Sequence, residues 1–475
     1  MISFFRIFDP VRIIALLLLF LLIKIPMMVK GVPMLSAELS WLLIGEKMAS
    51  GSVLYKDIWF QIEPFAGGVY YFADLLFGKS LTSYHVINII LIFGQAVFLN
   101  AILNNNNTYN EKSSVPSVLY ILFSSIFFDF KALSPALLGM TFIIAAFNFI
   151  LVQLKSKAKI ELILLVGTLT GIATLFYLSY LFFFVAVIII MLLHLFPPVK
   201  MYFTLLAGFL IPYLLILCYY FLIDGLDGLY LHLIAPFFST VNIRYITLWE
   251  TLALGLPMII LSTISIIYLQ NTKYINYQFQ TIKVTLIWSV FAGASLFFVK
   301  NIEPYHLLLI LPQAVILSTH FFLVVKNWWI REVTFVLVAA LLIGINYYTL
   351  YGKNKDKLVD YKPMVIESTG KYSNYKNKRV LVLGNNIEPY LDNKMATPYL
   401  SWSQSSRELL NLDDYHHLSQ IYQRFVQDIP EVIIDEEKLL DKLFYRLPVL
   451  KKKYYLSDST GIYILKSNSV ASQEE

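Results

Sequence analysis

The stretch Met34–Gly68, MLSAELSWLLIGEKMASGSVLYKDIWFQIEPFAGG, separates the first long apolar segment of the chain from the next. It holds the carboxylates Glu38, Glu46, Asp57 and Glu63, whereas acidic residues are sparse elsewhere in the first 350 residues. A carboxylate beside a membrane is costly unless it faces water, a partner or a metal ion. We therefore take this cluster as a candidate functional site that the rest of the chain holds in place.

The composition is that of a membrane protein. Of 475 residues, 58% are hydrophobic and only 14% are charged, whereas a soluble domain carries about 25% charged residues. The net charge of +6 is modest, and no basic stripe with interleaved aromatic residues indicates nucleic acid as a partner. The single cysteine, Cys218, lies in an apolar run, which excludes an internal disulfide and a metal site built from thiolates.

Long apolar segments recur along the first 350 residues. A spanning helix needs about 20 mostly apolar residues, and this criterion predicts an α-helical polytopic membrane protein with about 11 transmembrane helices. The expected spans are Val11–Val29, His85–Leu103, Val115–Phe128, Pro135–Leu154, Glu161–Leu178, Tyr180–Phe196, Met201–Ile223, Thr251–Leu269, Lys283–Val299, Tyr305–Val325 and Val333–Leu350.

The basic residues predict how these spans are oriented. Excess Lys and Arg mark cytoplasmic loops, and the run KSKAK, with Lys155, Lys157 and Lys159, is the clearest such marker. The N-terminus has Arg6 and Arg12 ahead of an apolar core but no small-residue cleavage site, so we expect an uncleaved, cytoplasmic N-terminus. The predicted location is a bacterial inner (plasma) membrane, with an odd number of spans placing the C-terminal region outside.

Beyond residue 350 the composition becomes mixed. We expect a polytopic transmembrane domain over 1–350, a linker over 351–370 and a small α/β extracytoplasmic domain over 371–475. In that last domain KRVLVLG, EVIID and GIYILK have strand character, with helical patterns between them. Within the first domain, the outer loop 31–84 is expected to carry two interfacial helices, the first amphipathic and capped by Ser36.

The carboxylates of the outer loop are the candidate catalytic groups. Glu38 could deprotonate an acceptor hydroxyl or bind a cation; the alternative is a solvated carboxylate at the membrane surface. Asp57 lies six residues before Glu63, and two converging carboxylates suit Mg²⁺ or Mn²⁺. Alternatively, Asp57 caps a turn and Glu63 pairs with Lys56. A divalent cation is thus left open and is not required.

A second charged motif, FFDFKALSP, lies at the outer end of the predicted third span and contains Asp129 and Lys131. The predicted orientation puts both on the same side of the membrane as Glu38. The alternative for this pair is a local ion pair at the interface. We therefore count Asp129 and Lys131 as candidate substrate-binding residues alongside Glu63.

A third motif, VKNIEPYHLLLILP, opens the predicted tenth span with Lys300, Glu303 and His306. A lysine at this depth suits a phosphate or pyrophosphate headgroup as a point charge, and a histidine can donate a hydrogen bond to it. The alternatives are a snorkelling Lys300 and a satisfied interfacial His306. Arg244, in the long outer loop after the seventh span, is a further candidate for binding phosphate.

The order of these motifs resembles that of the polytopic C-type (GT-C) glycosyltransferases, which include relatives of the protein mannosyltransferases and of the aminoarabinose transferase. That family shows an acidic residue after the first span, a G-x-x-x-Y-x-D…P return, and a Tyr/His entrance with a later proline on a late span. The resemblance covers the spanning three quarters of the chain, and the matching residues are Glu38, Gly51, Tyr55, Asp57, Pro64, Tyr305, His306 and Pro312.

The resemblance implies transfer of a sugar from a polyprenyl-phosphate carrier to an envelope acceptor on the outer face of the inner membrane. It implies that Glu38 and Asp57 activate the acceptor hydroxyl, while Lys300, His306 and Arg244 hold the donor phosphate. The implied partners are the polyprenyl-phosphate-linked sugar donor and membrane lipid, and the oligomeric state is left open. The alternative is a non-catalytic membrane scaffold of an envelope assembly or secretion system that reuses this fold.

Overall fold

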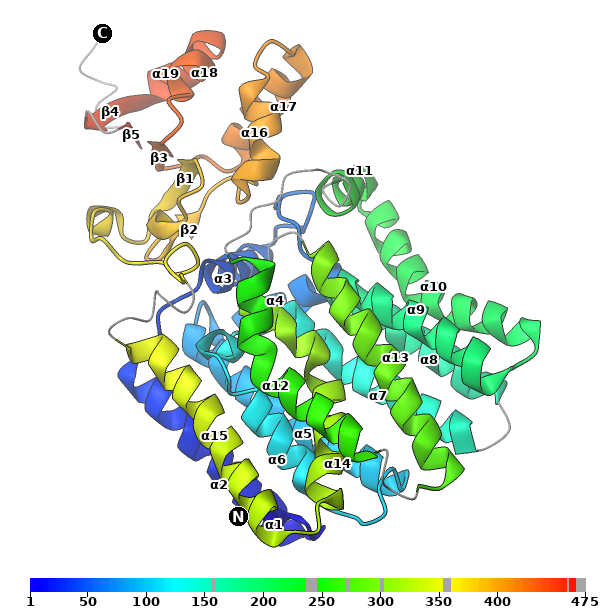
Figure 1. The fold of residues 1–475 in the computed structure, drawn as a ribbon. Helices are drawn as coiled ribbons and strands as arrows, with labels where there is room; N and C mark the ends of the chain where they lie inside the picture. The colour runs from blue at the N-terminus through cyan, green and yellow to red at the C-terminus, as the bar shows by residue number, and fades with distance from the viewer. Residues whose placement is uncertain are drawn as a thin grey trace. The chain divides into compact units, whose positions relative to one another are not determined.

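The structure is a computed structural model that describes residues 1–155, 159–235, 246–269, 274–299, 303–352, 360–458 and 461–466. The chain divides into two compact units, which we describe separately (Figure 1). The helical unit comprises Met1–Val32, Thr82–Leu217 and Val241–Pro363. The mixed unit comprises Pro33–Leu81, Cys218–Thr240 and Met364–Glu475, so the acidic outer loop groups by contacts with the C-terminal chain.

The helical unit is a bundle of long apolar helices. Within the described residues, 9 helical segments are long and apolar enough to cross a membrane. They are α2 (Pro10–Lys30), α5 (Leu81–Asn105), α7 (Pro135–Lys155), Leu178–Leu195 around α9 (Leu181–Ile190), α10 (Val199–Leu222), α12 (Leu248–Leu269), α13 (Asn276–Phe298), Pro304–Val324 ending in α14 (Leu311–Val324), and α15 (Trp328–Tyr351). The chain is a multi-pass membrane protein, as predicted.

The predicted third span is wrong in its extent. Helix α6 covers only Val115–Phe123, which is 9 residues or about 14 Å of rise, less than half of a bilayer core. The chain then leaves the α-helical path, makes one 3₁₀ turn at Phe128–Lys131 and re-enters a helix only at Pro135. The apolar run continues past Phe123, so hydropathy alone could not show where the helix ends.

The predicted fifth span, α8 (Ile160–Phe176), has 17 residues and is shorter than a full span. It packs closely on α10 through small residues. A Cβ added to Gly167 would lie 2.2 Å from the Leu205 carbonyl oxygen, and one added to Gly171 would lie 2.4 Å from that of Phe209. The G-x-x-x-G spacing therefore brings the two backbones together, as small residues do at helix contacts in membranes.

The mixed unit combines short helices with one five-stranded sheet. Its helices are α3 (Ser36–Ala49), α4 (Pro64–Phe77), α11 (Leu226–Leu229), α16 (Trp402–Leu410), α17 (Tyr415–Gln427), α18 (Leu440–Arg446) and α19 (Pro448–Lys453). Its strands are β1 (Arg379–Leu383), β2 (Lys394–Met395), β3 (Val432–Asp435), β4 (Tyr454–Asp458) and β5 (Ile462–Leu465). The three predicted strands are β1, β3 and β5.

The sheet has the order β2-β1-β3-β5-β4, with β1 parallel to both β2 and β3 and with β5 antiparallel to β3 and β4. One face of it, represented by Leu381, Leu383 and Ile433, packs against apolar residues of α16 to α19. Trp59, from the acidic outer loop, is buried in the same core. Its backbone also bonds to the C-terminal chain, from its N–H to Pro398 O and from Ser401 N–H to its carbonyl.

Helix α3 differs from the expected surface helix in two respects. Its N-cap is Leu35, one residue before the predicted Ser36. Its residues from Glu38 to Gly45 are all buried, and within the mixed unit the helix packs mainly on α4 and also contacts β2. The prediction of an amphipathic helix with one wet face is therefore wrong, although the helix itself was predicted with nearly correct ends.

Candidate functional site

The segment Ser124–Ser134 of the helical unit is an irregular, completely buried stretch of backbone. Non-helical backbone at membrane depth is tolerated only where other groups satisfy its polar atoms. Asn88 of α5 donates to the carbonyls of Phe130, at 3.0 Å, and Ala132, at 2.8 Å. Two more spans each donate one bond: Lys24 Nζ to Ser124 O at 3.4 Å and Asn346 to Ser125 O at 2.6 Å. We call Ser124–Ser134 the anchored loop.

The anchored loop carries two of the predicted site residues. Asp129 is fully buried, and its carboxylate accepts a 2.7 Å hydrogen bond from the Tyr305 backbone N–H. This bond joins the FFDFK and IEPYH motifs, which lie 176 positions apart in the sequence. The structure therefore brings together two of the three motifs that the sequence identified.

Two lysines accompany Asp129 inside the helical unit. Lys131 is 7% exposed and lies over the Phe128 ring, 5.9 Å from its centroid. Lys24 of α2 is 3% exposed, and the charges of both Asp129 and Lys131 act on its ammonium group. Buried charges in a membrane protein are expensive and mark functional sites by default, so this group is the strongest candidate site in the helical unit.

Tyr361 adds a polar group to this cluster. Its ring meets that of Phe128 edge to face, with centroids 4.8 Å apart. Its hydroxyl is buried and has no hydrogen-bond partner among the described residues. Burial raises the pKa of this phenol well above its usual range, and the charges of Asp129 and Glu250 raise it further. Tyr361 is thus a neutral hydroxyl that can donate a hydrogen bond near the anchored loop.

Glu303 and His306 cap the start of a short helix. They form the reciprocal capping pair of the 3₁₀ helix Pro304–Ile310, in which His306 Nδ1 lies 3.0 Å from the Glu303 backbone nitrogen. The imidazole is 2% exposed and lies against the rings of Tyr305 and Tyr177, at centroid distances of 4.2 and 5.6 Å. These contacts fit the alternative that the sequence left open, a satisfied histidine that fixes the start of a span.

Glu38, the predicted general base, lies in the mixed unit. It is fully buried, and its carboxylate accepts a 3.1 Å hydrogen bond from Leu35 N–H at the start of α3. The alternative of a solvated surface carboxylate is therefore wrong for Glu38. Capping the helix uses part of the hydrogen-bonding capacity of the carboxylate.

Asp57 and Glu63 also lie in the mixed unit. One oxygen of Asp57 accepts a 2.9 Å bond from Val53 N–H, and the other lies 3.5 Å from Arg424. Asp57 thus closes a turn, as the second alternative proposed. Glu63 stands at the N-cap position of α4. Lys56, its suggested partner, donates to the Ile223 carbonyl at 2.7 Å.

Two predicted phosphate ligands, Lys300 and Arg244, lie outside the described residues. Within the part of the chain that the structure describes, no three His, Cys, Asp or Glu side chains gather as a metal site. The carboxylates of Glu38 and Asp57 already accept hydrogen bonds from their own chain. The described residues therefore do not assemble a site for Mg²⁺ or Mn²⁺, and we derive no step through a metal.

The site residues that sequence reasoning missed are those that hold the anchored loop or face it. Lys24 lies within the first predicted span, and Tyr361 lies in the predicted linker. Asn88 and Asn346 sit inside apolar runs. The available signal was a polar side chain within each span, because such residues are rare in membrane helices and usually face a partner. The sequence could not tell which partner each one has.

No known family model and no curated protein matches this chain. Among solved structures it is similar to ArnT from Cupriavidus metallidurans bound to undecaprenyl phosphate, with a TM-score of 0.56, 10% identity, and coverage of 96% of this chain and 97% of that one. The apo state of the same protein has a TM-score of 0.52 and 9% identity, with coverage of 91% of this chain and 93% of that one. AglB from Archaeoglobus fulgidus, in complex with an inhibitory peptide and a dolichol-phosphate, has a TM-score of 0.47 and 10% identity, with coverage of 96% of this chain and 74% of that one.

The likeness to ArnT extends over nearly the full length of both chains. The predicted resemblance to the polytopic C-type glycosyltransferases is therefore confirmed at the level of the fold, including the small C-terminal domain with its sheet. At 10% identity the likeness concerns the fold alone.

Proposed function

We propose that this chain, which has the fold of the polytopic C-type glycosyltransferases, transfers a sugar from a polyprenyl-phosphate carrier to an envelope acceptor. The observation that carries the proposal is the likeness to ArnT over 96% of this chain, because that protein was solved with undecaprenyl phosphate bound. Fold alone does not establish an activity. The buried charges of the anchored loop supply the second support, since they are the kind of groups that bind a lipid phosphate.

The anchored loop suits a phosphate group attached to a lipid chain. Lys24 and Lys131 supply two ammonium groups against the single carboxylate of Asp129, and all three are buried within the helical unit. A lysine ammonium binds phosphate as a point charge, and Tyr361 can donate a hydrogen bond. In this proposal Lys300 and Arg244 join them as further phosphate ligands.

The proposed reaction breaks the bond between the anomeric carbon of the sugar and the phosphate oxygen of the carrier. A bond forms between that carbon and the acceptor hydroxyl oxygen. The acceptor proton passes to a carboxylate, for which Glu38 is the candidate and Asp57 the second one. The electron pair of the broken bond leaves with the polyprenyl phosphate, where cationic side chains stabilise the developing charge.

The proposal includes a location and an orientation. The protein would reside in a bacterial inner membrane with a cytoplasmic N-terminus and an extracytoplasmic domain over 371–475. The alternation of Lys and Arg between loops supports this orientation. Cysteine labelling tests it directly: in intact cells, a single cysteine placed at exposed Lys442 should react with a membrane-impermeant maleimide, and one placed at exposed Asn107 should not.

Release of the carrier tests the activity without knowledge of the acceptor. The purified chain is reconstituted with undecaprenyl-phosphate sugars and an envelope extract, and free undecaprenyl phosphate is measured by mass spectrometry. The E38Q variant keeps an oxygen that can accept the Leu35 N–H bond, so it should fold normally and lose about 10²-fold or more of the release rate. E437Q, which changes an exposed carboxylate of the C-terminal domain, should retain the wild-type rate. Full activity of E38Q would remove Glu38 from the mechanism.

A second candidate function is the non-catalytic scaffold, and one observation favours it. The two predicted catalytic carboxylates have local structural tasks, because Glu38 caps α3 and Asp57 closes a turn and pairs with Arg424. Under this alternative the wild-type chain releases no undecaprenyl phosphate from any donor offered. The same experiment therefore separates the two candidates.

A further inference from the structure

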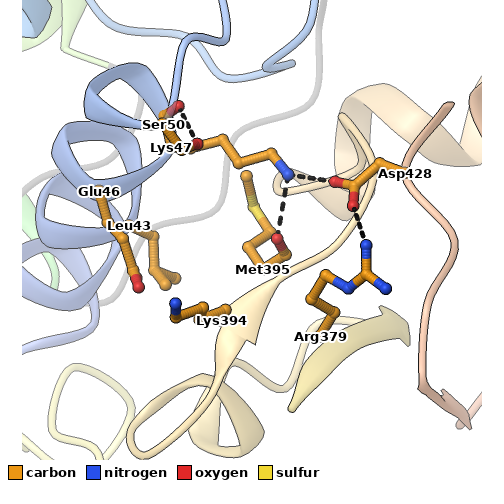
Figure 2. A pocket seen from close by; sticks show the side chains of 8 residues that line it. All are labelled: Leu43, Glu46, Lys47, Ser50, Arg379, Lys394, Met395 and Asp428. Carbon is orange, nitrogen blue, oxygen red and sulfur yellow. Dashed lines mark hydrogen bonds and ion pairs between the residues drawn. The ribbon is translucent and has the colours of Figure 1, made fainter. Parts of the chain in front are cut away.

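A cavity of about 250 Å³ lies within the mixed unit, where the last turn of α3 meets strands β1 and β2 (Figure 2). Lys47, Glu46 and Ser50 of α3 line one side of it. Arg379 of β1 and Lys394 of β2 line another, and Asp428 closes it beyond the end of α17. Three cationic side chains thus face a small, open space that is also lined by two carboxylates, one hydroxyl and the apolar side chains of Leu43 and Met395.

The carboxylates around this cavity already have cationic partners. Asp428 forms an ion pair with Lys47 and accepts a 3.0 Å hydrogen bond from Thr397 N–H. Glu46 is paired with Lys79 at 3.1 Å. Each of these two acids therefore has a lysine of its own, and Lys47 donates additionally to the Met395 carbonyl at 3.1 Å.

Arg379 and Lys394 are not neutralised by close ion pairs with the described residues. The closest ion-pair distances of Arg379 are 3.6 Å to Asp428 and 4.0 Å to Glu431, both longer than a hydrogen bond. The side chain of Lys394 forms no ion pair and no hydrogen bond with any described residue. Both residues are exposed. They are therefore accessible cations whose partners within the chain are weak or absent.

The strand register makes these two cations neighbours. Arg379 and Lys394 are register partners in the parallel pair β1–β2, so their side chains leave the same face of adjacent strands that lie about 4.8 Å apart. Like charges directly opposite each other repel. The two side chains diverge accordingly, Arg379 toward Asp428 and Lys394 toward α3 (Figure 2). An anion between them would relieve the repulsion.

We propose that this cavity binds a phosphate monoester, with Arg379 and Lys394 as its ligands. A guanidinium offers two parallel N–H donors to phosphate oxygens, and a lysine adds a mobile point charge. The volume is below the usual range for drug-sized ligands and suits a phosphate with one small group attached. The site is distinct from the proposed transfer reaction, because none of its lining residues is among those named for that reaction.

Isothermal titration of the full-length chain in detergent at constant ionic strength tests this site. The probes are inorganic phosphate, glucose 1-phosphate and dodecyl phosphate, which separate free phosphate, a sugar phosphate and a lipid phosphate. R379Q and K394Q should each weaken glucose 1-phosphate binding about tenfold, and K394R should restore most of it. K442Q removes an exposed lysine of α18 and should leave the affinity unchanged.

Each remaining outcome would overturn the site. Equal weakening by K442Q and K394Q would mean general attraction to a basic surface. No binding of inorganic phosphate or glucose 1-phosphate to the folded chain would remove the site altogether. If only dodecyl phosphate binds, and K394Q does not affect it, the lipid phosphate binds elsewhere; that result contradicts this inference and leaves the proposed transferase intact. Conversely, phosphate binding that depends on Lys394 would stand even if no sugar transfer is ever found.

Discussion

Replacing Asn88 with leucine should loosen the anchored loop more than any other change of similar size. The amide of Asn88 donates to two buried carbonyls, those of Phe130 at 3.0 Å and Ala132 at 2.8 Å. A buried acceptor left without its donor costs about 1–3 kcal/mol. Ala132 keeps a bond from Ser134 N–H, so its share is at the low end, and we expect a total loss of about 2–4 kcal/mol.

A matched control lies on the same helix. Asn100 of α5 is 3% exposed, and its side chain has no hydrogen bond to any described residue. N100L leaves no hydrogen-bond partner among the described residues unsatisfied and should not lower the stability. Both variants are unfolded in detergent micelles by heat, with tryptophan fluorescence as the signal. N88L should melt several degrees below wild type, whereas N100L should melt with it.

The comparison has a clear negative result. If N88L and N100L are equally stable, the two carbonyl bonds do not hold the loop, and the structural basis for placing Asp129 and Lys131 fails. If N88L is destabilised as expected, it should also weaken undecaprenyl phosphate binding, because the loop that carries both charges is no longer fixed.

Three further perturbations test other parts of the account. W59A should destabilise the mixed unit by about 3–5 kcal/mol in thermal unfolding, because Trp59 is 4% exposed in the core that includes the sheet. Burial lowers the pKa of His232 from 6.5 to about 4. Between these pH values the unfolded chain binds more protons than the folded chain, so the free energy of unfolding should fall by up to about 3 kcal/mol as the pH drops from 6.5 to 4. The H232Q variant should not show this pH dependence. G171A places a Cβ 2.4 Å from the Phe209 carbonyl oxygen, so it should separate α8 from α10 and lower the melting temperature. G94A is the control: a Cβ at Gly94 meets nothing within 4 Å, and the melting temperature should stay that of wild type.

Hydropathy predicted the bundle well because each long span contains a mostly apolar stretch long enough to cross a membrane. It failed at Val115–Phe128, where an apolar helix of 9 residues passes into an apolar irregular segment. Apolar residues are frequent on both sides of that point. The irregular segment differs from the helix because side chains of α2, α5 and α15 donate hydrogen bonds to its backbone carbonyls. Those hydrogen bonds depend on the tertiary structure.

The C-terminal sheet shows the same limit. Strands β1, β3 and β5 have apolar runs and were predicted, whereas β4 was not predicted. Strand β4 lies at the edge of the sheet, and Tyr455, Leu456 and Ser457 within it are exposed, so its apolar signal is weak. The two-residue strand β2 has no signal of its own, since it exists only through pairing with β1.

The candidate site was predictable in part. The motifs around Asp129 and Tyr305 were both identified from the sequence, and the structure joins them through a 2.7 Å hydrogen bond. The sequence could not show that Glu38 would be fully buried rather than solvated, because burial of helix α3 depends on tertiary contacts, among them those with α4 and β2. Its role as a base stays a prediction.

Binding of undecaprenyl phosphate tests the central claim most directly. Native mass spectrometry of the full-length chain in detergent compares this lipid with undecaprenol, which has the same tail and no phosphate. The account predicts that wild type retains undecaprenyl phosphate in preference to undecaprenol, and that K131Q loses about tenfold of that preference while remaining folded. Equal retention of the two lipids, or a K131Q variant that discriminates as well as wild type, would contradict the assignment of the anchored loop as the carrier-phosphate site.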